Sequence, residues 1–199
     1  MKQDQPFLTD VETLRAKARA HIEQGPVTPT YQGDAQKTIE ILQTVLATEI
    51  VCVLRYTANA ICAIGLASES VKDEFEQHAK EEQEHMRRVA ERINELGGTP
   101  NLNPEGLATR SASQYANPEG LVEMIRENLI AERIAVEHYR ELIRYFGDKD
   151  PTTRVMLESI LTNEEEHAND MLDLLRAHDT QVNATPVGAH TDGGKHRRS

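Results

Sequence analysis

The sequence contains the stretch Thr48-Glu49-Ile50-Val51-Cys52-Val53-Leu54-Arg55-Tyr56, and a related stretch follows 83 residues later. The second stretch reads Ala131-Glu132-Arg133-Ile134-Ala135-Val136-Glu137-His138-Tyr139, with Glu, Val and Tyr at the same three places. Separations of four and seven residues place these side chains on one face of a helix. The rest of this face is apolar, through Leu42, Leu46, Ala60 and Ala63 in the first copy and Ile125, Leu129, Ile143 and Phe146 in the second. An apolar stripe that Glu interrupts at equivalent places in two helices indicates a carboxylate with a task inside the protein.

Four long segments with helical periodicity predict an all-α protein, an antiparallel four-helix bundle over residues 34–178 with a long central crossover. The first helix runs from the cap Asp34 to about Ala67, and the second from Ser70, with Asp73 three residues on, to Leu96 before Gly97-Gly98. The third runs from Asn117-Pro118 to Gly147, and the fourth from Asp150-Pro151 to about His178. Each helix would then be about 27 to 32 residues long, which suits an up-down bundle.

Three segments lie outside these helices. Residues 1–33 form an N-terminal extension, in which Thr9 to Glu23 has the apolar spacing of a short helix. The crossover joins the second and third helices, and Pro104 to Tyr115 within it fits another short helix. Residues 179–199 are polar and contain several glycines, so we expect a disordered tail.

The composition is that of an acidic, single-domain protein. Among 199 residues, 33 Asp and Glu outnumber 22 Lys and Arg, and the net charge of −11 argues against a nucleic-acid-binding surface over the whole protein. The basic residues at 195–198 make only a weak case for DNA contact. No stretch approaches the roughly 20 apolar residues of a membrane span, and the first residues do not resemble a secretory signal. We therefore expect a soluble, cytoplasmic protein without membrane contact.

The two cysteines, Cys52 and Cys62, lie ten residues apart in one predicted helix. They would be about 15 Å apart along the helix axis, too far to bond to each other. Both are interpreted as buried thiols, and Cys52 as an inert one despite lying one turn from Glu49.

Two further motifs place a carboxylate and an imidazole three residues apart, on the same side of a helix. They are Glu82-Gln83-Glu84-His85 in the second helix and Glu164-Glu165-Glu166-His167 in the fourth. One such motif occurs easily by chance, but the joint pattern is specific. Each half of the chain supplies a Glu from one helix, and then, 33 or 32 residues later, a Glu-x-x-His from the next.

This is the ligand pattern of a di-iron or di-manganese four-helix bundle. Folding each half as a hairpin brings the six side chains to one level of the core. Four carboxylates and two neutral imidazoles carry a charge of −4, which balances two divalent cations. Oxygen and imidazole donors without a thiolate favour iron or manganese. The predicted metal ligands, which are also the predicted catalytic residues, are Glu49, Glu82, His85, Glu132, Glu164 and His167.

Four residues near the predicted ligands are not themselves predicted to bind metal. Tyr56 and Tyr139 lie beyond the ligating Glu on the same face, where they either donate hydrogen bonds to ligand carboxylates or only pack in the core. His78 lies one turn before Glu82 and is expected at the surface, with a place facing the site or an iron path as the alternative. His138 lies off the ligand face and is expected to be structural or exposed.

The six-residue pattern resembles the ferritin superfamily, and within it bacterioferritin and the bacterioferritin-like members of the Dps (DNA protection during starvation) group. The similarity spans about Gln36 to Leu175. It implies Glu49 and His85 on one metal, Glu132 and His167 on the other, and Glu82 and Glu164 bridging both. It also implies oxidation of two Fe(II) ions per subunit by dioxygen or peroxide, and storage of the ferric mineral in a hollow protein shell.

The sequence departs from the family pattern in ways that bear on haem binding, on the number of subunits and on where the iron site lies. Bacterioferritin binds haem through a Met directly after the first bridging Glu, and because Gln83 stands there, haem is not expected. Shells of 24 subunits carry a fifth helix after the bundle, whereas this chain continues into a polar tail after His178. A homo-oligomeric shell of 12 is therefore favoured over one of 24. Ordinary Dps proteins build the iron site between subunits from other residues, so the match is to the subgroup with a site inside one bundle.

Two other functions remain open from the sequence. A non-storage dinuclear iron or manganese redox enzyme, catalase-like or peroxidase-like, would use the same ligands and consume peroxide without accumulating iron. A metal-free helical interaction protein would bind no metal, and replacing Glu49 and Glu132 by alanine would then stabilise it.

Overall fold

The computed structural model describes residues 8–65 and 68–184, and of residues 179–184 only the backbone. All regular elements in these ranges are helices, as the sequence predicts. They are α1 (Val11–Arg19), the 3-10 helix η1 (Ile22–Gln24), α2 (Ala35–Cys62), α3 (Ser68–Glu95), α4 (Leu107–Arg110), α5 (Leu121–Phe146) and α6 (Pro151–Ala184).

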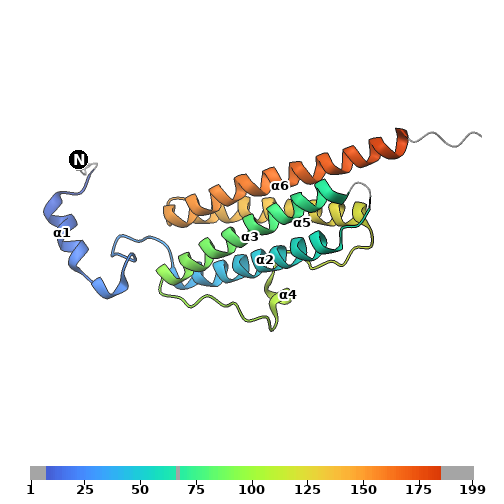
Figure 1. Cartoon of the computed structure of the whole chain (residues 1–199). Coiled ribbons are helices and arrows are strands. Elements are labelled where there is room, and N and C mark those ends of the chain that lie inside the picture. The colour runs from blue at the N-terminus through green and yellow to red at the C-terminus, as the bar shows by residue number, and fades with distance from the viewer. Residues whose placement is uncertain (1–7, 66–67, 185–199) are drawn as a thin grey trace, which may run out of the picture.

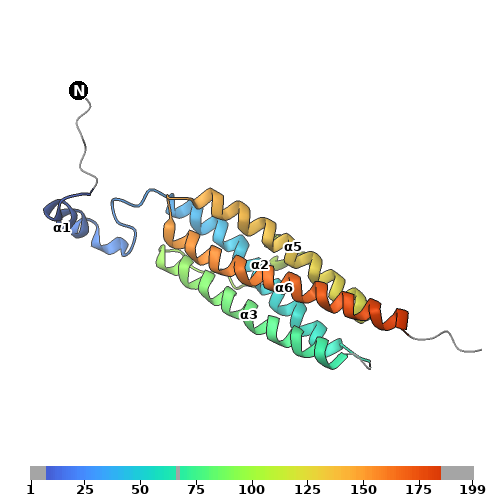
Figure 2. The ribbon, with the colours of Figure 1, turned by 90° about the horizontal axis from the view of Figure 1, so that it is seen from above.

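The four long helices lie side by side in both views, α2 and α6 running one way and α3 and α5 the other (Figures 1 and 2). The main packing partners are α2 with α3 and α5 with α6, so each half of the chain forms a helical hairpin. The repeated stretches, which lie in α2 and α5, thereby occupy corresponding places in the two hairpins.

The apolar core consists of two clusters that surround one polar level. One cluster lies toward the start of α2 and includes Leu46, Val89 and Ile160; the other lies toward its end and includes Tyr56, Phe75 and Met171. The six predicted metal ligands are distributed over the four long helices. On each helix they lie between residues of one cluster and residues of the other. A fully polar level inside an otherwise apolar core costs stability unless its groups are paired or bind cations.

Several predicted helix boundaries are correct. The Asp34 carboxylate accepts a hydrogen bond from the Lys37 backbone N–H at 3.0 Å, so α2 begins at the expected cap. Gly147 follows α5 with φ +45°, a conformation that suits glycine, and Pro151 is the first residue of α6.

Other boundaries were wrong. The helix α2 ends at Cys62 rather than Ala67: Ala63 is already extended, with ψ 113°, and Gly65 follows with φ +134°, a conformation that suits glycine. Two starts also differ: α3 begins at Ser68 rather than after Ser70, and α5 begins at Leu121, after Gly120 rather than at Pro118. The last helix continues to Ala184, six residues beyond His178 and into the predicted tail. Residues 185–199, on which the expectations of a disordered end and of no fifth helix also depend, lie outside the described residues.

The crossover between α3 and α5 runs back along the bundle against α2 (Figure 1). Gln43 Nε2 donates to the Thr99 carbonyl at 2.8 Å, the Ala112 N–H donates to Thr48 Oγ1 at 2.9 Å, and Arg55 Nη1 donates to the Gln114 carbonyl at 3.2 Å. The helix predicted over Pro104 to Tyr115 is present but has only four residues, α4. The predicted N-terminal helix corresponds to α1 and η1; α1 projects from the bundle and has no buried residue.

Two expectations from composition need correction. Cys52 is buried as expected, but Cys62 is exposed, because α2 ends there, beyond the packed part of the core. Although the sequence predicts no membrane span, the helix α2 contains an 18-residue window that is long and apolar enough to span a membrane by composition. Since 61% of that window is buried inside the protein, its apolar character is explained by core packing.

A buried ion pair between Arg92 and Asp150 connects α3 to the start of α6, and Tyr31 links the segment before α2 to the same carboxylate. Arg92 donates from Nη2 to Asp150 Oδ1 at 3.0 Å and from Nε to Thr153 Oγ1 at 2.9 Å. Asp150 also accepts hydrogen bonds from the Thr153 backbone N–H at 3.0 Å and from the Tyr31 hydroxyl at 2.9 Å. Asp150 is therefore a helix cap, as predicted, and also the centre of a network that joins three parts of the chain.

The stabilising effect of Asp150 should disappear in acid. Burial alone would raise the pKa of Asp150, but hydrogen bonds from Thr153 and Tyr31 and the charge of Arg92 outweigh burial and lower it. A carboxyl group with a lowered pKa stabilises the fold above its unfolded pKa, about 3.9, and loses this effect as pH falls through the folded value. The difference in unfolding free energy between wild type and Asp150→Ala should thus be constant near neutral pH and shrink below about pH 4. Urea denaturation across a pH series measures it, and a difference that grows in acid would contradict the assignment.

Candidate metal centre

Six buried side chains from four helices meet at the polar level of the core. Glu49 comes from α2, Glu82 and His85 from α3, Glu132 from α5, and Glu164 and His167 from α6, and each is at most 2% exposed. Spacing of three residues along α3 and α6 directs the carboxylate and the imidazole of each motif to the same side. The structure therefore brings together all six residues that the sequence pattern selected.

The six form two overlapping groups of four, in each of which the candidate ligand atoms lie within 4.8 Å of one another. One group is Glu49, Glu82, His85 and Glu164, and the other is Glu82, Glu132, Glu164 and His167. Glu82 and Glu164 belong to both groups, while the other four residues belong to one each. This is the arrangement expected for two adjacent cations with two shared carboxylates.

The imidazoles turn their Nδ1 atoms toward these carboxylates. His85 Nδ1 lies 3.1 Å from Glu164, 3.4 Å from Glu49 and 3.5 Å from Glu82. His167 Nδ1 lies 3.3 Å from Glu82 and 3.9 Å from Glu132. Each ring thus faces the carboxylates of its own group.

Many of the inward-facing atoms have no hydrogen-bond partner among the described residues. These atoms are Glu49 Oε2, both oxygens of Glu82, His85 Nδ1, Glu132 Oε2, Glu164 Oε1 and His167 Nδ1. Buried polar atoms are nearly always satisfied, so seven unpartnered donor and acceptor atoms facing one place call for a ligand that accepts lone pairs from all of them. A pair of divalent cations fits this requirement in donor type and in charge.

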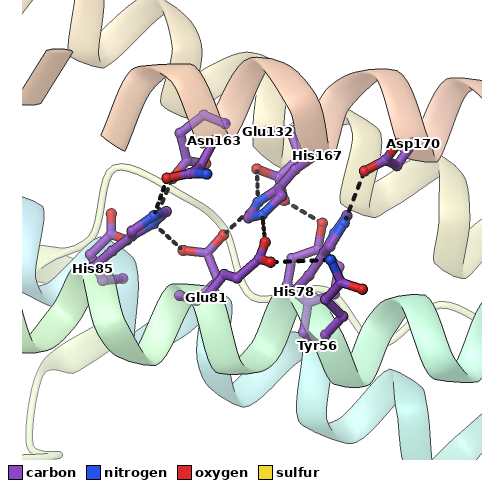
Figure 3. A network of polar contacts seen from close by, with 12 residues as sticks. Tyr56, His78, Glu81, His85, Glu132, Asn163, His167 and Asp170 are labelled. Carbon is purple, nitrogen blue, oxygen red and sulfur yellow. Dashed lines mark hydrogen bonds and ion pairs between the residues drawn. The ribbon is translucent and has the colours of Figure 1, made fainter. Parts of the chain in front are cut away.

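The outward-facing nitrogens of both imidazoles have partners that sequence reasoning missed. His167 Nε2 lies 2.6 Å from Glu81 Oε2, and His85 Nε2 lies 3.3 Å from Asn163 Oδ1 (Figure 3). An oxygen at Nε2 favours the tautomer that leaves the Nδ1 lone pair facing the carboxylates. Glu81 and Asn163 directly precede Glu82 and Glu164, so a polar residue before each Glu-x-x-His motif was the available signal.

Two tyrosines connect the halves of the centre. The Tyr139 hydroxyl donates to Glu49 Oε1 at 2.5 Å, and the Tyr56 hydroxyl donates to Glu132 Oε1. Each tyrosine therefore binds the carboxylate of the opposite repeat, and both hydroxyls are engaged in addition to packing in the core. These bonds hold one oxygen of each terminal carboxylate and leave the other directed at the centre.

Burial is the largest influence on the acidity of the four carboxyl groups. It raises the pKa of Glu49 to about 7, and repulsion by Glu82 adds to the effect. Burial and Glu82 also raise the pKa values of Glu132 and Glu164. Burial acts in the same direction on Glu82, but the contacts with His167 and His85 outweigh it and lower the Glu82 pKa. Without cations, this centre retains protons that metal ligation must displace.

The pKa values of the two imidazoles are determined by the carboxylates rather than by burial. Burial alone would lower their pKa values, but the surrounding carboxylates outweigh it and raise the pKa of His167 to about 9 and that of His85 further. A cluster of four acids and two bases whose affinities for protons are so strongly altered is typical of a functional site.

The positions of three residues near the centre can also be compared with those predicted from the sequence. His78 is fully buried, so its expected surface position was wrong: α6 covers it, and its ring stacks on His167 with centroids 3.9 Å apart. Burial, helped by His167, lowers the pKa of His78 to about 3, so its ring is neutral near pH 7. His138 is partly buried. Burial raises the pKa of the Cys52 thiol well above its ordinary value, as expected of an inert cysteine.

Comparison with known proteins gives a family and one curated relative. Residues 39–179 match the model of the ferritin-like domain. The relative is the DNA protection during starvation protein of Pyrococcus furiosus, which is 33% identical over 137 residues, covering 67% of this chain and 74% of that protein.

Solved structures agree with this result. A dodecameric thioferritin, the bacterioferritin-related protein from Bacteroides fragilis, matches with a TM-score of 0.74 and 31% identity, covering 77% of this chain and 92% of the other. A ferritin-like di-iron-carboxylate protein from Bacillus anthracis matches with a TM-score of 0.63 and 27% identity, covering 71% and 96%. A Dps from Thermosynechococcus elongatus, at 15% identity and a TM-score of 0.67, shares the fold over 70% of this chain and 90% of its own.

Proposed function

This chain belongs to the ferritin-like family, and we propose that it is a ferroxidase that stores or detoxifies iron. The observation that carries the proposal is the pair of overlapping four-residue groups inside one chain, with Glu82 and Glu164 common to both. Iron(II) is the substrate: two ions supply two electrons, which reduce dioxygen to peroxide or peroxide to water. Manganese is the alternative metal for the same oxygen and imidazole donors, and haem is not part of the proposal.

The residues divide into terminal and shared ligands. Glu49 and His85 would hold one ion, and Glu132 and His167 the other. Glu82 and Glu164 would bridge the two ions. Tyr56 and Tyr139 orient the terminal carboxylates, and Glu81 and Asn163 orient the imidazoles. The apolar clusters on either side limit access of water along the bundle axis.

We further propose that the protein acts as a cytoplasmic homo-oligomeric shell of 12 subunits, with the ferric product held inside. The dodecameric relative from Bacteroides fragilis supports the subunit number, since this chain covers 92% of it. A net charge of −11 suits a shell that attracts cations, and it disfavours binding to DNA.

Iron uptake by the sized assembly tests this function. Fe(II) is added in large excess over two per chain, with dioxygen or peroxide as oxidant, and the shell is measured by light scattering in the same sample. Storage predicts that far more iron than the centre binds stays soluble inside a large assembly. Rapid loss of peroxide with no retained iron would instead identify the catalase-like or peroxidase-like redox enzyme.

Removing one tyrosine hydroxyl should weaken the centre without abolishing it. Tyr139→Phe deletes the bond to Glu49, which then has no fixed orientation toward the cation, so we expect metal affinity to fall about 10- to 100-fold. Tyr56→Phe should act equally through Glu132. Anaerobic Co²⁺ titration measures the change. The matched control is Tyr145→Phe on the same helix, where the side chain is exposed; an equal loss in that variant would refute the role of Tyr139.

A further inference from the structure

A second group of metal-ligating side chains lies one helical turn from the centre. It consists of Glu74 and His78 on α3 and Asp170 on α6, none of which belongs to the six. His78 Nε2 lies 3.2 Å from Glu74 Oε1 and 3.4 Å from Asp170 Oδ2, and the three candidate ligand atoms lie within 4.8 Å of one another. Figure 3 shows His78 and Asp170 facing each other from the two helices.

The buried imidazole is the decisive member of this group. The side chain of His78 is 0% exposed, and neither ring nitrogen has a hydrogen-bond partner among the described residues. The ring is held in place by stacking on His167 and by an edge contact with Tyr56 at 5.1 Å between centroids. Leaving a buried imidazole unsatisfied is costly, so a fixed Nε2 aimed at two carboxylates indicates a ligand between them.

Packing alone does not require a histidine here. The internal repeat relates Glu82 and His85 to Glu164 and His167 with an offset of 82 residues. The same offset relates His78 to Ile160, which is fully buried in the other apolar cluster. An aliphatic side chain fills the equivalent place in the second half, so His78 is a departure from the repeat that adds a donor atom.

We propose that Glu74, His78 and Asp170 bind one divalent first-row transition-metal ion, in addition to the two ions proposed for the centre. Metal–nitrogen and metal–oxygen bonds of about 2.0–2.2 Å place neighbouring ligand atoms roughly 3.0–3.5 Å apart, and both measured separations from His78 fall in this range. Two carboxylates and a neutral imidazole carry a charge of −2, which one such cation balances.

The location of this site differs from that of the centre. The side chains of Glu74 and Asp170 are 30% and 39% exposed, whereas those of the six are at most 2% exposed. A cation therefore reaches Glu74 and Asp170 from solvent and, once bound to His78, lies beside the ring of His167. The proposal does not depend on the ferroxidase function, because the two sites have no ligand in common.

Anaerobic Co²⁺ titration of the intact protein tests the proposal, with absorbance and calorimetry reporting the ions bound per chain. The informative variants are Asp170→Asn and Glu74→Gln, which keep the size of partly exposed side chains, and Glu82→Ala, which disrupts the centre. The matched control is Asp173→Asn, an exposed acid one turn further along α6. Wild type and Asp173→Asn should bind one more ion per chain than Asp170→Asn or Glu74→Gln.

The outcomes separate the two proposals. One ion retained by Glu82→Ala and lost in the double variant Glu82→Ala with Asp170→Asn supports the additional site, whatever happens at the centre. Equal binding by wild type, Asp170→Asn and Glu74→Gln overturns the additional site while leaving the centre intact. Loss of every ion in Glu82→Ala alone also overturns it.

Discussion

Replacing Glu82 by alanine should weaken binding at both positions of the centre and lower the rate of iron oxidation by more than about 100-fold. Substitution of residues that only orient ligands already costs about 10- to 100-fold, and Glu82 is itself placed to ligate both ions. Glu82 also lies 3.3 Å from His167 and 3.5 Å from His85, so its loss removes the carboxylate common to both imidazoles. Initial rates of Fe(III) formation, followed by absorbance, measure the effect.

The control for this variant is available on the same helix. Glu84→Ala removes an exposed carboxylate that pairs with Arg87, and it should leave oxidation unchanged. Circular dichroism of metal-free Glu82→Ala establishes whether it is folded, because the variant removes a buried carboxylate that contacts both imidazoles. Wild-type oxidation rates in a folded Glu82→Ala protein would contradict the assignment of Glu82 as a shared ligand.

Replacing Asp150 by alanine should lower the free energy of unfolding by about 3 kcal/mol, because it breaks a buried ion pair. The change removes the buried carboxylate partner of the Arg92 guanidinium, whose side chain is 8% exposed. Arg92 then keeps only its pair with Glu95, whose side chain is 54% exposed. It also removes the cap of α6 and the acceptor for Tyr31. Urea denaturation of the chelator-treated protein measures the loss.

Asp148 provides the comparison for Asp150. It lies two residues earlier and pairs with Arg154 at 2.9 Å, but its side chain is 99% exposed. Exposed ion pairs contribute about 0–1 kcal/mol, so Asp148→Ala should have little effect. Similar losses in both variants would show that burial of the Asp150 pair does not determine its contribution.

The fold and the six candidate ligands could be predicted because both depend on patterns along the chain. Helical periodicity gives the four long helices, and the offset repeat of Glu49 and Glu132 marks their shared level. Local signals also located the caps at Asp34 and Asp150. The end of α2 was missed because Gly65 lies inside an apparently continuous apolar stretch.

The remaining features depend on contacts between helices that are distant in sequence. His78 was placed at the surface because its burial is produced by α6, through His167. The pairing of Arg92 with Asp150, 58 residues away, has no signature in either local sequence. The crossed bonds from Tyr56 and Tyr139 to the opposite repeat likewise follow from how the two hairpins pack.

Under the proposed function, one chain holds two metal ions between these six side chains. Anomalous diffraction at the iron edge, from crystals loaded anaerobically with Fe(II), locates such ions. Within this centre we predict two peaks, one beside Glu49 and His85 and one beside Glu132 and His167, with Glu82 and Glu164 in contact with both. The absence of anomalous density between these residues, in crystals of folded protein soaked with excess iron, would contradict the assignment of the six as metal ligands.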